Sequence, residues 1–231
     1  MKKGCLVALG IPMGLVVLVM VILWANFYNI HVRYRLTVEV QDGDLVKTGS
    51  SVVEALYDIQ PTWSWSGPGN STRVIGYAPT VDLGDKGLLF LTFADATRTP
   101  AERAERNDYV FCAADDVYCL PFEAYGERGT SVTTHHDDRK APIEALLKNS
   151  GPREVPFAAL PKLARFRNGD DQRLLVHVTP YNLASTFGPN VQLKRVVLQL
   201  TDDPITPPPT IWPQWLTIKH QNTILRGYEA D

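Results

Sequence analysis

Two cysteines in the middle of this 231-residue chain have a spacing that could support chemistry. Cys112 and Cys119 flank Asp115-Asp116, and this symmetry predicts a hairpin with the two aspartates at its tip. Cysteines that face each other across a hairpin have Cα atoms about 4.5 to 5.5 Å apart, within disulfide reach. In an oxidising compartment the bond would stabilise the fold by roughly 2.5 kcal/mol. We therefore predict a structural disulfide between Cys112 and Cys119, with free buried thiols in a reducing compartment as the alternative.

One histidine–aspartate cluster resembles a metal site. It is His135-His136-Asp137-Asp138, in which His135 and Asp137 would share one face of an extended segment. A zinc site needs three or four ligands, and the sequence indicates no further ones. A solvated surface loop is therefore favoured, and we predict no metal and no cofactor.

Catalytic motifs are absent from the sequence. It contains no G-x-S-x-G, H-E-x-x-H, P-loop or G-x-G-x-x-G. His177 lies in an apolar strand and is interpreted as a core or edge histidine. Asp202-Asp203 precedes a proline and is interpreted as a turn cap. We assign no catalytic residues, and an enzymatic role is disfavoured.

The first 29 residues predict a membrane anchor. Lys2 and Lys3 precede an uncharged apolar run, residues 5–25, which contains twelve Leu, Ile and Val. As a helix this run would rise roughly 31 Å, about the thickness of the hydrocarbon core. A cleaved signal peptide is disfavoured by the length of the run and by Leu23 at the −3 position before Ala25. The lipid bilayer is therefore the first predicted partner.

The charges that flank this run predict its orientation. Lys2 and Lys3 favour a cytoplasmic N-terminus in the inner membrane, which places residues 30–231 in the periplasm. Arg33 and Arg35 on the other flank weaken this bias, so an inverted anchor with a cytoplasmic domain remains the alternative. Across the chain, 23 Lys and Arg against 25 Asp and Glu argue against nucleic-acid binding, which needs a basic surface.

Residues 30–231 predict one α+β domain, dominated by antiparallel hairpins with short inserted helices. Apolar and polar residues alternate from 32 to 41, the period of a half-buried strand. Further strands are expected at 51–59, 73–83, 88–93, 173–179 and 192–201, and helices at 99–106, 142–149 and 157–166. The proline-rich segment 204–215 must be extended, and Trp212 and Trp215 are expected to pin it onto the sheet; an aromatic docking surface is the alternative.

Several strand and turn segments carry a family resemblance. They are YRLTVEV from Tyr34, GSSVVE from Gly49, VDLGDKG from Val81, LKRV from Leu193 and LTDDPIT from Leu200. Together they resemble an uncharacterised family of single-pass, membrane-anchored proteobacterial proteins. The resemblance implies an anchored envelope protein but transfers no catalytic or binding residue, and Cys112 and Cys119 are outside the matching segments.

Anchor, composition and resemblance together predict a membrane-anchored bacterial envelope protein. We expect a non-enzymatic protein-interaction or structural role, with an envelope protein as a second partner. The alternative is a membrane-tethered hydrolase whose site is built from scattered His and Asp residues.

Overall fold

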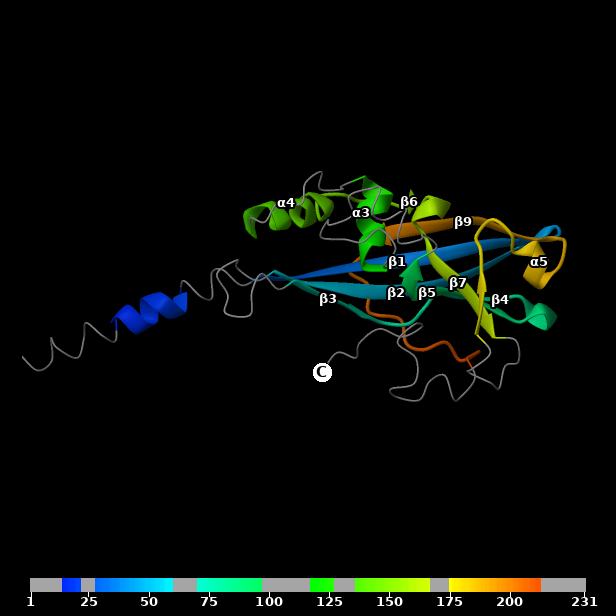
Figure 1. The fold of residues 1–231 in the computed structure, drawn as a ribbon, viewed down its shortest axis with the longest axis horizontal. Helices are drawn as coiled ribbons and strands as arrows, with labels where there is room; N and C mark the ends of the chain where they lie inside the picture. Colours follow the sequence, from blue (N-terminus) through cyan, green and yellow to red (C-terminus); the bar gives the residue numbers. More distant parts are fainter. Residues whose placement is uncertain are drawn as a thin grey trace, which may run out of the picture.

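A computed structural model describes residues 14–21, 28–59, 70–96, 117–126, 136–166 and 175–212. Within these residues the chain is an antiparallel β-rich domain with a few short helices, so the predicted α+β class is confirmed (Figure 1). The strands are β1 (Tyr28–Asp42), β2 (Leu45–Ile59), β3 (Asn70–Ile75), β4 (Thr80–Asp82), β5 (Leu88–Ala96), β6 (Arg153–Glu154), β7 (Pro161–Phe166), β8 (Leu175–Val178) and β9 (Val191–Leu200). The helices are η1 (Gly84–Lys86), η2 (Val117–Cys119), α3 (Leu120–Tyr125), α4 (His136–Leu146), η3 (Phe157–Ala159) and α5 (Ala184–Phe187).

The first sheet has the strand order β3-β2-β1-β9-β6 and is built on the long β1–β2 hairpin. Asp42 pairs with Leu45, so the turn is only Gly43-Asp44, and Gly43 has a φ of 61° that favours glycine. The even-numbered residues of β1 from Val32 to Val40 are buried, while the odd-numbered residues lie on the outer face. The alternation predicted from the sequence is therefore confirmed.

The second sheet has the order β4-β5-β7-β8 and covers the inner face of the first. β4 and β5 form the predicted hairpin through η1, and Asp82 Oδ1 accepts a hydrogen bond from the Gly84 amide at 2.8 Å. Helices α3 and α4 extend this cover, with Phe122 and Ile143 in the same buried core as the sheet residues. The two sheets and these helices thus share one hydrophobic core.

The two sheets approach each other closely where β2 meets β4. A Cβ on Gly49 would lie 1.9 Å from the backbone oxygen of Thr80, so only glycine allows this approach. Trp212 lies 5% exposed beside the same strand and donates from Nε1 to Thr80 Oγ1 at 2.7 Å. Its ring makes edge contacts with Tyr77 and Phe90. We call Gly49, Thr80 and Trp212 the sheet junction.

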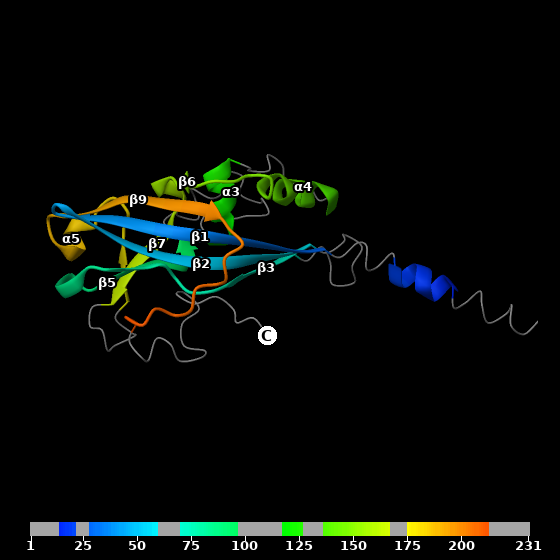
Figure 2. The same cartoon turned by 180° about the vertical axis from the view of Figure 1, so that it is seen from behind.

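The segment after β9, residues 201–212, crosses the outer face of β1 and β2 to reach this junction (Figure 2). The Thr201 amide donates to the carbonyl of Arg33, and the Thr206 amide donates to the carbonyl of Val52. Thr206 Oγ1 also accepts from the Val52 amide at 2.8 Å. The prediction that Trp212 pins an extended tail is confirmed, whereas Trp215 lies outside the described residues.

Two helix predictions differ from the structure. The segment 157–166, expected to be a helix, is a single turn (η3) followed by strand β7, which pairs with both β5 and β8. Pro161 opens this strand, a position that does not require its missing amide hydrogen. α4 begins at His136, before the predicted start at 142, and has Pro142 in its interior. The predicted helix 99–106 lies outside the described residues.

The hairpin predicted around Asp115-Asp116 is also wrong on its second side. Residues 117–119 form η2, and α3 follows directly with Pro121 in its first turn. Proline at that position favours a helix and cannot donate to a strand ladder. Cys119 is buried at the end of η2, whereas Cys112 lies outside the described residues. A disulfide between the two therefore remains a prediction, without facing strands as its basis.

The predicted anchor is described only in part, as a short helix of residues 14–21. Across the residues that the structure covers, there is no helix with the length and apolar character needed to cross a bilayer. The remaining residues of the apolar run lie outside the described ranges, and the anchor stays a prediction.

Candidate functional site

A buried carboxylate on the outer face of the first sheet is the centre of the candidate site. Glu54 in β2 lies directly opposite Arg33 in β1, and its side chain is only 6% exposed. His31 Nδ1 lies 2.8 Å from Glu54 Oε1, and the Nε of Arg33 donates to Glu54 Oε2. Because side chains two residues apart in a strand share a face, the β1 alternation brings both partners to the same carboxylate.

These contacts keep Glu54 ionised. Burial alone would raise the pKa of Glu54, but hydrogen bonds from His31 and Arg33 and the positive charge of Arg33 outweigh it and lower the pKa below its usual range. Both carboxylate oxygens are engaged, so Glu54 acts as a fixed anion that holds two donors in place. It is a poor proton acceptor near neutral pH.

The outer parts of His31 and Arg33 remain available to a ligand. Their side chains are 53% and 44% exposed. Arg33 uses Nε for Glu54, which leaves its two terminal nitrogens without a partner among the described residues. His31 uses Nδ1, which leaves Nε2. The site therefore presents the terminal donors of Arg33 and the Nε2 of His31 above a buried carboxylate.

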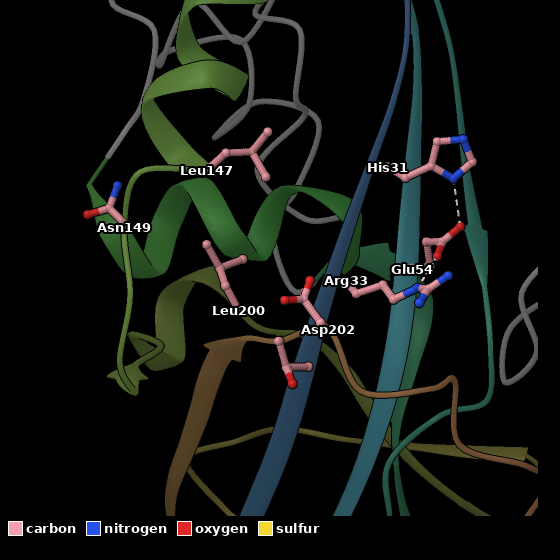
Figure 3. Close-up of a pocket in the computed structure, with 8 residues that line it drawn as sticks. His31, Arg33, Glu54, Leu147, Asn149, Leu200 and Asp202 are labelled. Atoms are coloured by element: carbon pink, nitrogen blue, oxygen red, sulfur yellow. Dashed lines mark hydrogen bonds and ion pairs between the residues drawn. The ribbon is translucent and has the colours of Figure 1, made fainter.

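These donors line a pocket of about 460 Å³ at the end of the first sheet, where β9 stops at Leu200 and β1 continues (Figure 3). The volume lies in the range of small-molecule sites. The lining residues are His31, Arg33, Glu54, Leu147, Asn149, Leu200, Thr201 and Asp202. The pocket thus combines the Arg33 guanidinium, the His31 ring, one carboxylate from the tail and two leucines.

Asp202 and Asp203 have different surroundings although they are neighbours in the tail. Asp203 Oδ2 accepts from Arg35 at 2.7 Å and from Thr201 Oγ1 at 2.6 Å, and these contacts lower the pKa of Asp203. Asp202 lines the pocket and has no ion pair or hydrogen bond within the described part of the chain. The turn-cap interpretation is not confirmed for Asp203, because Thr201 Oγ1 accepts from the Asp203 amide at 3.2 Å while the Asp203 carboxylate bonds side chains. Asp202 carries a charge without a described partner into the pocket.

Of the residues singled out from the sequence, Asp202 lines this pocket and His177 does not. His136, Asp137 and Asp138 begin α4, so the segment is helical rather than a loop, and His135 lies outside the described residues. His177 is an exposed residue of β8, the last strand in the second sheet's order, as expected for an edge histidine. Within the described ranges, no three His, Cys, Asp or Glu side chains are grouped to hold a metal ion.

Sequence reasoning missed His31, Arg33 and Glu54 as a group. Glu54 is the one carboxylate between apolar residues in Val52-Val53-Glu54-Ala55-Leu56, and an acid in that position signals a buried ion pair. The signal became readable only with the register that places Arg33 opposite it.

Comparisons with protein families, curated proteins and solved structures found no match to this chain. The site is therefore interpreted from its geometry.

Proposed function

We propose that this chain is a single-pass envelope protein whose periplasmic domain binds a ligand or partner at the pocket beside its anchor, without catalysing a reaction. The observation that carries the binding role is Glu54, whose two oxygens are both occupied by donors from β1. A carboxylate committed in this way positions other groups for recognition and is unavailable as a base.

The anchor rests on the apolar run at residues 5–25, which has the length of a bilayer-spanning helix. β1 begins at Tyr28, only three residues beyond Ala25. The pocket residue His31 is six residues from the end of the run, at most about 20 Å even for an extended chain. An anchored domain would therefore hold the pocket close to the membrane surface.

Membrane extraction tests the anchor. The full chain is expected to stay in the membrane pellet after alkaline carbonate treatment, and a Leu18→Arg plus Val19→Arg variant is expected to move to the supernatant, because charges in the hydrocarbon core oppose insertion. A matched variant, Thr48→Arg plus Ser50→Arg, places the same charges on exposed strand positions and should stay in the pellet. A full chain that is released by carbonate contradicts the proposal.

Thiol labelling tests the orientation and the disulfide together. Cys112 should react with a membrane-impermeant maleimide on intact spheroplasts only after reduction, if it is paired with Cys119 in the periplasm, whereas Cys119 is buried and should stay unlabelled in the folded domain. Labelling without reduction contradicts the disulfide, and labelling only after lysis contradicts the orientation.

A tethered hydrolase is the second candidate, because the bond from His31 Nδ1 to a carboxylate orients the ring and leaves Nε2 to accept a proton. Turnover of ester or phosphodiester substrates by the purified chain, lost in His31→Gln and kept in His177→Gln, would favour the hydrolase. No turnover in any of the three proteins is expected under our proposal.

A further inference from the structure

The pocket beside the proposed anchor contains charged groups of both signs, and only some of them are paired with an opposite charge in the described part of the chain. Glu54 is neutralised by Arg33 and bonded to His31, whereas Asp202 has no partner among the described residues. Figure 3 shows Asp202 between the β1–β2 side chains and the leucine side of the pocket. A ligand with only a negative charge would meet Asp202, and one with only a positive charge would leave the terminal donors of Arg33 without an acceptor.

A ligand that carries both charges can pair with Arg33 and with Asp202 together. Its anion would accept hydrogen bonds from the terminal nitrogens of Arg33, since guanidinium donors match phosphate oxygens. Its ammonium would pair with Asp202. The side chains of Leu147 and Leu200 provide an apolar wall for a short carbon linker.

We propose that this pocket binds a phosphoethanolamine-type group, a phosphate diester joined through two carbons to a primary ammonium. Two sources share this chemistry, the headgroup of a membrane phospholipid and a soluble glycerophosphodiester. The lipid source rests on the proposed anchor, which would hold the pocket within reach of the headgroup layer.

The tail provides a matched pair of variants. Asp202→Asn removes the carboxylate that faces the pocket, and Asp203→Asn removes its neighbour, which bonds Arg35 instead. Both are single-charge changes one residue apart on the same exposed segment. Circular dichroism and the urea midpoint confirm that each variant is folded.

Titration calorimetry of the full chain in maltoside micelles with glycerophosphoethanolamine tests the chemistry. We expect saturable binding, weakened about three- to fivefold by Asp202→Asn and less than twofold by Asp203→Asn, the upper size expected for loss of one exposed ion pair. Glycerophosphoglycerol, which has the phosphate diester but no ammonium, should bind about three- to fivefold more weakly. Equal binding of the two compounds, equal effects of the two variants, or no binding would overturn the proposal.

Nanodiscs identify the source. If the lipid headgroup occupies the pocket, the chain in phosphatidylethanolamine discs should no longer bind glycerophosphoethanolamine, while the chain in phosphatidylglycerol discs still binds it. Binding in both discs identifies the soluble compound as the ligand and supports the site equally. Because the micelle titration does not require a membrane, its outcome is independent of the carbonate test, so failure of the anchor and failure of the site are distinguishable.

Discussion

The sheet junction and the pocket lie on the same hairpin but differ in how completely they are filled. At the junction, Gly49 leaves no room for a methyl group, and Trp212 fills the space beside Thr80 with both its ring and its donor. At the pocket, donors and one carboxylate remain without partners among the described residues. The difference indicates that the junction stabilises the fold. The pocket instead has polar atoms without a partner in the described part of the protein, which are available to bind a ligand.

The largest expected effect is at the junction. Trp212→Ala should lower the free energy of unfolding by about 3 to 5 kcal/mol, because it leaves a cavity between Tyr77 and Phe90. Urea denaturation of the full chain in micelles measures it. Trp212→Phe, which keeps a ring but removes the donor to Thr80, should cost less, about 1 to 2 kcal/mol. A loss below about 1 kcal/mol for Trp212→Ala would show that the tail is not held there.

Gly49→Ala should cause the second largest loss in the free energy of unfolding. The added methyl would meet the Thr80 backbone oxygen, so β4 must move, which typically costs about 1 to 3 kcal/mol. The neighbouring exposed Thr48 is the control, and Thr48→Ala should change stability by less than about 1 kcal/mol. Equal urea midpoints for the two variants would contradict the close approach of β2 and β4.

Glu54→Gln tests how much the buried carboxylate beneath the pocket contributes to the stability of the fold. We expect a loss of about 1.5 kcal/mol at pH 7, at the low end for charged hydrogen bonds because both partners are half exposed. Since folding lowers the pKa of Glu54, its contribution is present above the unfolded value near 4.3 and is lost as the pH falls through the folded value.

The pH dependence of stability checks this sign. The difference in urea midpoint between wild type and Glu54→Gln should be constant from pH 7 to about 5 and shrink as the pH falls to 3. The more exposed Glu39 in β1 pairs with the cations Lys194 and Arg195 of β9, so Glu39→Gln should cost less at pH 7. A difference that grows on acidification would contradict an ionised Glu54.

The smallest stability effect is expected in the pocket itself. Asp202→Asn should leave the urea midpoint unchanged, because no described residue pairs with this side chain. Asp203→Asn should lower the midpoint slightly, because Arg35 and Thr201 lose a common acceptor. If Asp202→Asn instead stabilises or destabilises the domain clearly, Asp202 has a structural role and the contrast between the two regions fails.

Local patterns in the sequence predicted several of the strands, although the single strand expected at 73–83 is divided into β3 and β4, which belong to different sheets. The alternation from 32 to 41 and the glycine turns predicted β1, its buried face and the β4–β5 hairpin, since the strand period and turn conformations depend on neighbouring residues. The same reasoning failed at 157–166, because an apolar segment of this length is compatible with a helix or a strand. Its pairing with β5 and β8 makes residues 161–166 a strand.

Tertiary structure alone decided the site. Glu54 is opposite Arg33 because of the hairpin register, and its pocket is completed by Asp202 from a tail that reaches Val52 from 154 residues away. The sequence by itself determined that a charged outer face and a buried inner face exist, because residue alternation encodes them. Which charges meet, and which one stays unpaired, depends on contacts between distant segments that no local pattern contains.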